Sequence, residues 1–269
     1  MSLLKKQFYL IAVCLLLTAA PVLGSDFKVI TPYWGVVENA FVNDKFDLEL
    51  KDSQPTKGLY FQTVDPDKYQ LNLFIYRTED INYSDLAGVN FIYDRYFRAE
   101  AKVKNLIGLG VNYLRIDLSG KSIPAKTGSL DTFNLDQKIS SLYLRIGRNY
   151  SYNQGQTSYS VLPWIGGQLD QSRGTGLVDP PGPNSIPIII NTDQFSWIAG
   201  VNLKANWRHF LQLETKHSIA YFNSDHLNKN SAMVNLSLTK NLGLSYRYNY
   251  HQTTLGKDSY HLFGLAVLF

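Results

Sequence analysis

The fold of this chain is decided by its C-terminal stretch, Tyr260-His261-Leu262-Phe263-Gly264-Leu265-Ala266-Val267-Leu268-Phe269. Successive side chains of a β-strand point to opposite faces, so residues two apart share a face. From residue 263 onward, one face of this stretch carries only large apolar side chains, namely Phe263, Leu265, Val267 and Phe269. The pattern predicts a strand with one strongly apolar face that ends on an aromatic residue.

The same alternation recurs upstream, in residues 141–147, 197–206, 232–239 and 244–251. A soluble β-sandwich also alternates, but its solvent face is typically rich in Lys and Glu. Here the polar face is mostly Asn, Ser, Gly, Gln and Thr, and aromatic residues lie near the ends of the segments. A lipid-facing apolar band, aromatic girdles and a polar interior are typical of transmembrane β-barrels.

The C-terminal stretch resembles the closing-strand signature of Gram-negative outer-membrane β-barrel proteins, in which a terminal aromatic residue follows alternating apolar residues. The resemblance covers about ten residues and identifies no narrower family. It implies an all-β, transmembrane antiparallel β-barrel in the outer membrane of a Gram-negative bacterium. The implied partners are outer-membrane lipid and the barrel-assembly machinery, while the oligomeric state stays open.

Composition excludes several other classes of protein. The chain is 45% hydrophobic and 18% charged, with 18 Tyr and one Cys. Disorder needs more charge and fewer aromatic residues, and one cysteine excludes a disulfide framework or a cysteine-based metal site. The net charge of +4 is scattered along the chain, so we expect no nucleic-acid partner.

The N-terminus predicts an export signal. Lys5 and Lys6 precede an apolar run over residues 8–17, and small residues follow up to Gly24. This is the order of parts in a secretory signal peptide, and the run is too short to span a bilayer. A lipoprotein signal at Cys14 would truncate the run. We therefore expect residues 1–24 to be cleaved and residues 25–269 to form a single barrel domain.

Counting back from the C-terminus predicts about twelve strands, an even number as bacterial single-chain barrels require. The candidate segments are 28–38, 56–65, 68–78, 88–98, 106–118, 137–148, 156–166, 195–206, 210–222, 230–240, 243–252 and 259–269. Short periplasmic turns and longer outer loops would connect them, the latter at 39–55, 119–136 and 167–194. Residues 45–50 could form another strand and 106–118 could contain a bulge or project beyond the membrane, so ten or fourteen strands remain open.

The segment 167–194 stands out among the expected outer loops. It contains Asp179-Pro180-Pro181-Gly182-Pro183 and then Ile188-Ile189-Ile190. A loop of this length is usually functional or disordered, and three consecutive isoleucines are costly to leave in water. The segment either folds into the barrel mouth or forms a mobile surface loop.

No reaction centre is evident in the sequence. His217 and Ser218 are adjacent, so on a strand they point to opposite faces, whereas a nucleophile needs its base within hydrogen-bond reach. His251 and Thr253 share a face, but Thr is a rare nucleophile. No metal-ligand spacing or phosphate-binding glycine motif is present. We expect no catalysis, metal or cofactor.

The polar faces of the predicted strands supply the candidate lumen residues, which are Arg145, Asn202, Lys204, Glu214, Lys216, Arg247 and Asn249. Glu214 and Lys216 partly neutralise each other, which leaves Arg145, Lys204 and Arg247 in excess. Rings of Arg or Lys favour anions in pores, so we hypothesise a passive, porin-like channel for small hydrophilic solutes, anions included. The alternatives are a closed structural or surface-interaction barrel that acts through its outer loops, and a lipid-modifying enzyme.

Overall fold

The computed structural model describes residues 27–43, 48–65, 67–79, 84–100, 102–125, 128–179, 185–208, 210–222, 225–253 and 256–268. The predicted signal peptide, residues 1–24, and the terminal Phe269 lie outside these ranges. Within them, no helix has the length and apolar character needed to cross a membrane.

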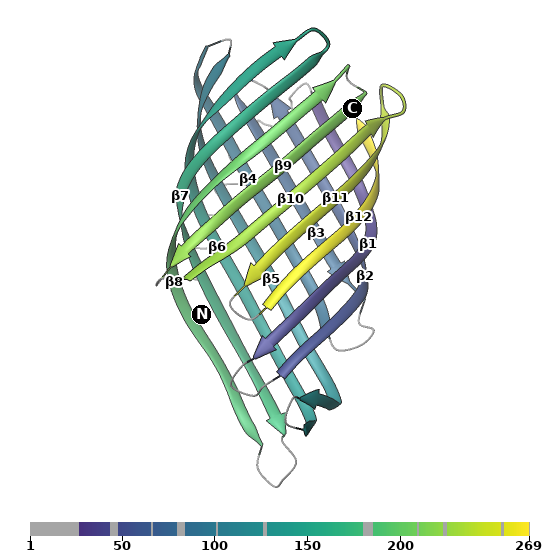
Figure 1. Cartoon of the computed structure of the whole chain (residues 1–269), viewed down its shortest axis with the longest axis vertical. Helices are drawn as coiled ribbons and strands as arrows, with labels where there is room; N and C mark the ends of the chain where they lie inside the picture. Colours follow the sequence, from purple (N-terminus) through teal and green to yellow (C-terminus); the bar gives the residue numbers. More distant parts are fainter. Residues whose placement is uncertain are drawn as a thin grey trace.

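Twelve antiparallel strands form one closed barrel, in which each strand pairs with its neighbours in sequence and β1 pairs with β12 (Figure 1). The strands are β1 (Phe27–Asn43), β2 (Leu48–Asp65), β3 (Tyr69–Thr78), β4 (Ser84–Glu100), β5 (Val103–Ala125), β6 (Gly128–Gln154), β7 (Thr157–Asp179), β8 (Ile186–Trp207), β9 (Leu211–Phe222), β10 (Asp225–Ser237), β11 (Leu242–Thr253) and β12 (Gly256–Leu268). Each predicted segment overlaps one of them. The predicted all-β barrel of twelve strands is confirmed.

The closing strand β12 shows how the sequence pattern becomes a barrel wall. Phe263 is 62% exposed and points outward with Leu265 and Val267, whereas Leu262 and Ala266 are buried on the inner face. Because β12 pairs with β11 on one side and with β1 on the other, no free edge remains. Because the barrel is closed, no strand edge exposes unpaired backbone N–H and C=O groups, and a bilayer requires that these groups be paired.

The outer surface carries an apolar band between two groups of exposed aromatic residues. Trp197 and Trp207 both point outward on β8, ten positions apart. At about 3.3 Å per residue and a tilt of about 40°, this separation matches the apolar band of roughly 25 Å in outer-membrane barrels. Exposed aromatic residues at the same end of the band as Trp207 are Phe97, Tyr150, Tyr152, Tyr159 and Phe210, and those at the Trp197 end are Tyr113, Phe195 and Tyr221.

Outward-facing ion pairs lie just beyond the apolar band, at the end of the barrel opposite the C-terminus. The pairs are Lys57–Glu79, Arg77–Asp85, Arg115–Asp117, Arg115–Asp136, Lys138–Asp136 and Arg173–Asp193. Charged side chains are costly at the bilayer midplane and cheap near its interfaces. This ion-pair belt, defined by these residues, therefore marks the edge of the band next to the outer mouth.

The expected outer loops are instead the ends of long strands. Residues 119–125 belong to β5 and 128–136 to β6, while 167–179 belong to β7 and 186–194 to β8. Residues 39–43 and 48–55 likewise extend β1 and β2. The loop predictions were wrong because glycines and charged residues are tolerated in a two-stranded extension that stands outside the membrane.

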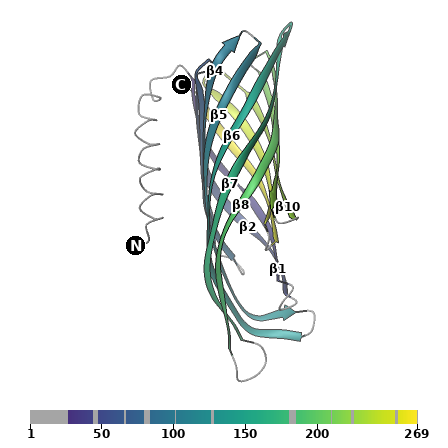
Figure 2. The ribbon, with the colours of Figure 1, turned by 90° about the vertical axis from the view of Figure 1, so that its left-hand side faces the viewer.

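Strand β5 projects past the ion-pair belt without a bulge among its pairs with β6. Its inner face carries Leu114, Ile116 and Leu118, which continue the face of Gly108 and Gly110. Beyond them, the β5–β6 hairpin bends across the barrel mouth while the β7–β8 hairpin continues outward (Figure 2). Strand β5 also contacts β2, which is not its neighbour in the barrel wall.

Candidate functional site

Side chains fill much of the barrel lumen. Two clusters of buried residues lie on the inner faces of the strands, one on the β1–β4 and β12 side and the other on the β5–β9 side. The first contains Tyr33, Val37, Tyr60, Phe74, Leu86, Tyr260 and Leu262, and the second contains Leu106, Tyr143, Leu162, Trp164, Ile198 and Ala220. Six of the chain's tyrosines therefore face inward rather than forming girdles: Tyr33, Tyr60, Tyr76, Tyr96, Tyr143 and Tyr260.

Glycines on neighbouring strands make room for these rings. Tyr143 on β6 is in register with Gly110 on β5, and Trp164 on β7 is in register with Gly200 on β8. A Cβ atom at either glycine would overlap the facing ring. The rings therefore lie flat along the inner wall instead of pointing to the barrel axis, which leaves space at the centre.

A buried ion pair links β4 to β6 across β5. Arg145 donates two hydrogen bonds to Asp94, from Nε to Oδ1 at 3.0 Å and from Nη2 to Oδ2 at 2.6 Å. The two side chains are 5% and 4% exposed. The Arg145 guanidinium also lies 5.1 Å from the centre of the Trp164 ring. This two-point contact holds Arg145 in one orientation.

A second charged group lies on β8 and β9. The Lys216 ammonium lies 2.6 Å from the carboxylate of Glu214, two positions away on the same face. Lys204 is in register with Glu214 from the neighbouring strand. Glu214 is buried. Its single negative charge faces the two lysines, Lys216 and Lys204.

Arg247 on β11 contacts aromatic rings rather than a carboxylate. Its guanidinium carbon lies 4.0 Å from the centre of the Tyr60 ring, and the rings of Phe74 and Tyr33 are 5.2 and 5.6 Å away. It also donates a hydrogen bond to Sδ of Met233 at 3.6 Å. Cation–π contacts hold the guanidinium without cancelling its charge.

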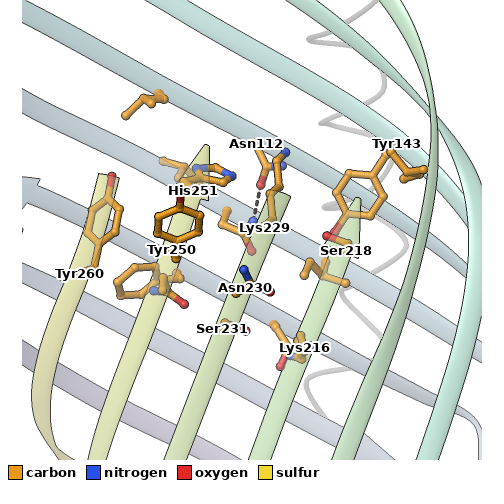
Figure 3. A pocket seen from close by; sticks show the side chains of 18 of the residues that line it. Asn112, Tyr143, Lys216, Ser218, Lys229, Asn230, Ser231, Tyr250, His251 and Tyr260 are labelled. Carbon is orange, nitrogen blue, oxygen red and sulfur yellow. Dashed lines mark hydrogen bonds between the residues drawn. The ribbon is translucent and has the colours of Figure 1, made fainter. Parts of the chain in front are cut away.

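A cavity of about 230 Å³ remains between these groups, inside the barrel. Side chains from β9 to β12, among them Lys216, Lys229, His251 and Tyr260, lie before Asn112 and Tyr143 on the far wall (Figure 3). Amides and hydroxyls supply most of the other polar lining. Among the described lining residues, four are cations, Arg145, Lys216, Lys229 and Arg247, and none is Asp or Glu.

No protein-family model matches the chain. Among solved structures, the translocator domain of autotransporter NalP from Neisseria meningitidis matches with a TM-score of 0.53 at 10% identity, covering 98% of each chain. The transport unit of the autotransporter AIDA-I from Escherichia coli matches with a TM-score of 0.54 at 11% identity, covering 90% of each chain. The KdgM porin matches with a TM-score of 0.45 at 7% identity, covering 89% of this chain and 99% of that one. The chain has the fold of an outer-membrane β-barrel.

The likeness confirms the predicted outer-membrane β-barrel architecture, and at this identity it shows the fold alone. In this β-barrel, five of the predicted lumen residues line the cavity, namely Arg145, Asn202, Lys216, Arg247 and Asn249. Glu214 is buried behind Lys216, and Lys204 lies beside Glu214, away from the cavity lining. The prediction that Arg145 contributes excess positive charge was wrong, because Asp94 neutralises its charge.

Sequence reasoning missed Lys229 as a cavity residue. It lies one position before the predicted start of its strand, on the same face as Ser231. The alternation over residues 229–235 could have extended the strand and found it. No sequence pattern indicated that the rings of Tyr60 and Trp164 are buried, because tyrosine and tryptophan are also common at the membrane interface.

His217 and Ser218 point to opposite faces of β9, as their adjacent positions predict. His217 is exposed on the outer wall, where its Nδ1 is hydrogen-bonded to Oδ1 of Asn230, while Ser218 lines the cavity. Nδ1 of His261 pairs with the hydroxyl of Tyr246 at 3.0 Å. Over the described residues, no group of three or more His, Cys, Asp or Glu is placed to hold a metal ion.

Proposed function

We propose that the protein is a narrow channel in the outer membrane that passes small hydrophilic solutes and favours anions. The observation that carries this proposal is the charge of the cavity lining, which has four cations and no Asp or Glu among its described residues. A cationic lining at a constriction attracts anions and repels cations. Residues 1–24 are proposed to direct export and then to be removed.

Arg247 and Lys229 are the cations best placed to meet a solute. Within the described part of the chain, neither forms an ion pair, whereas Arg145 and Lys216 are each held by a carboxylate. Their charges are therefore the least compensated at the cavity. The two sit on neighbouring strands, β11 and β10, so one anion could contact both in turn.

The size of the cavity limits the solutes. Pockets for drug-sized ligands are about 300–1,000 Å³, and this cavity is about 230 Å³. Twelve strands also enclose a lumen between that of eight-stranded barrels, which side chains fill, and that of porins. The proposal therefore specifies small anions and a low conductance rather than a wide aqueous pore.

Charge inversion tests the proposal. Lys229→Glu and Arg247→Glu each place a carboxylate in the cavity, and recordings of the refolded variants in planar bilayers should show reduced anion preference. Lys257→Glu is the matched control, because Lys257 is exposed on the outer face of β12. An unchanged ion preference in both cavity variants, or an equal change in the control, would overturn the assignment.

A surface-interaction role is the second candidate, and the β7–β8 hairpin favours it. Ile189 is 79% exposed beyond the ion-pair belt. Together with exposed Leu177 on the paired strand, Ile189 forms an apolar group outside the bilayer, and grouped exposed apolar side chains mark contact sites. Replacing residues 174–190 with a two-residue turn removes Ile189 and keeps the Arg173–Asn191 register; loss of cell-surface binding with unchanged conductance would support this second role. No catalytic step is proposed.

A further inference from the structure

The outward faces of two parts of the barrel wall, β5–β7 and β9–β10, differ in chemistry. At the depth of the apolar band, the outward side chains of β5 to β7 are apolar at Leu109, Leu142, Leu144, Ile146 and Ile165. On β9 and β10, the corresponding positions are polar or small, namely Thr215, His217, Asn228, Asn230 and Ala232. We call these five residues the β9–β10 polar strip. A barrel surrounded only by lipid has no reason to differ in this way.

The β9–β10 polar strip lies at the depth of the bilayer. On β9, Thr215 and His217 stand between the exposed rings of Phe210 and Tyr221, which belong to the two aromatic edges of the band. The strand pairing places Ala232 beside Thr215 and Asn230 beside His217. The strip is therefore not a projection into water.

Several polar groups of the strip form no hydrogen bond within the described part of the chain. His217 Nδ1 pairs with Oδ1 of Asn230. Over the described residues, no hydrogen bond reaches Nε2 of His217, the Asn230 amide nitrogen or the Thr215 hydroxyl. An unpaired polar group in hydrocarbon is costly, and polar side chains inside a membrane usually mark a functional contact.

We propose that the barrel forms a two-fold symmetric dimer in the membrane, with the β9–β10 polar strip of one copy against that of a second copy. A two-fold contact brings the same patch together twice. The strip carries no formal charge, so two copies do not repel each other, and its amide and hydroxyl groups both donate and accept hydrogen bonds. Thr215 and Ala232 are small, which permits close approach, as small residues do between membrane helices.

Cysteine cross-linking tests this arrangement. The chain's only cysteine is Cys14, within the predicted signal peptide, so a single cysteine placed on the barrel reports one position. Thr215→Cys in lipid bilayers should form a disulfide-linked dimer on mild oxidation. Leu144→Cys, 60% exposed on β6, three strands away from β9, is the control and should cross-link several-fold less. Equal cross-linking at both positions would overturn the proposal.

A second variant tests the role of the polar groups. His217→Leu combined with Asn230→Leu replaces the strip's hydrogen-bonding groups with side chains that lipid tolerates, and heat-modifiable gel migration reports whether the barrel still folds. Mass measurement in lipid nanodiscs should show dimers for the unmodified protein and monomers for the double variant. If the unmodified protein is monomeric, the proposal is contradicted. It is also contradicted if this face binds a different membrane protein instead of a second copy of the chain.

Discussion

Arg145 and Asp94 are joined across an intervening strand, directly over a glycine. Asp94 on β4 is in register with Gly108 on β5, which is in register with Arg145 on β6. A Cβ atom at position 108 would overlap both side chains. The glycine therefore allows two residues on non-adjacent strands to form a two-point ion pair on the inner wall.

Removing one partner of this pair should destabilise the barrel. Arg145→Gln leaves the buried carboxylate of Asp94 without its cation, a change that typically costs about 3–5 kcal/mol. The free energy of unfolding, measured by denaturant titration of the barrel folded into vesicles, should fall by about that amount. The double variant Arg145→Met with Asp94→Leu should recover most of the loss. Additive losses in the double variant would contradict a coupled pair.

Removing the ring of Trp164 should widen the lumen. This side chain lies over Gly200 and beside the guanidinium of Arg145, so Trp164→Ala enlarges the cavity between them. The single-channel conductance should rise several-fold. Trp197→Ala is the matched control, because Trp197 is 68% exposed on the lipid-facing side, and it should leave the conductance unchanged. A rise in the control alone would contradict the assignment of the two faces.

Shortening the β5–β6 hairpin should open the outer mouth. Leu118 and Leu135 are paired in register and buried, so a two-residue turn in place of residues 119–134 preserves the strands below. Because the hairpin bends across the mouth (Figure 2), the conductance of the shortened barrel should increase. The β7–β8 hairpin continues outward, and its shortening at residues 174–190 should have no such effect. Equal effects of the two deletions would exclude a specific role for the bend.

One carboxyl group of the ion-pair belt should have a lowered pKa. Hydrogen bonds from Gln171 and Arg173 lower the pKa of the Asp193 carboxyl, which lies at the outer edge of the band. A carboxyl whose pKa is lowered by folding contributes stability above its unfolded pKa, about 3.9, and loses it as the pH falls through its folded pKa. Carbon-detected NMR titration should show the lowered pKa, and Arg173→Gln should raise it. An unchanged Asp193 pKa in that variant would contradict the contact.

The strand number and the orientation of the wall could be predicted from sequence because both depend on local alternation. In β12, Phe263, Leu265 and Val267 form an unbroken run of large apolar side chains on one face, whereas Gly264 and Ala266 interrupt the other face, and the outward face was predicted from that difference. The bilayer imposes this pattern on every strand, so it repeats often enough to be counted. The inward faces of β9 and β11 follow from the same alternation.

The lumen contacts could not be predicted, because they depend on register between strands. Asp94 and Arg145 are 51 positions apart in the sequence, and a shift of one residue in either pairing would separate them. The lengths of the outer strands were missed for a different reason. Beyond the membrane both faces of a hairpin meet water, so the alternation that identifies a strand weakens, and residues 119–136 and 167–194 were taken for loops.

Ion selectivity of the unmodified protein tests the central claim most directly. The refolded barrel is placed in a planar bilayer between two concentrations of potassium chloride, and the potential at zero current is measured. The cationic lining of the cavity predicts discrete, small conductance steps and a zero-current potential displaced toward the equilibrium potential of chloride. A displacement toward the equilibrium potential of potassium, or the absence of conductance steps from barrels shown to be folded by their heat-modifiable migration, would contradict it.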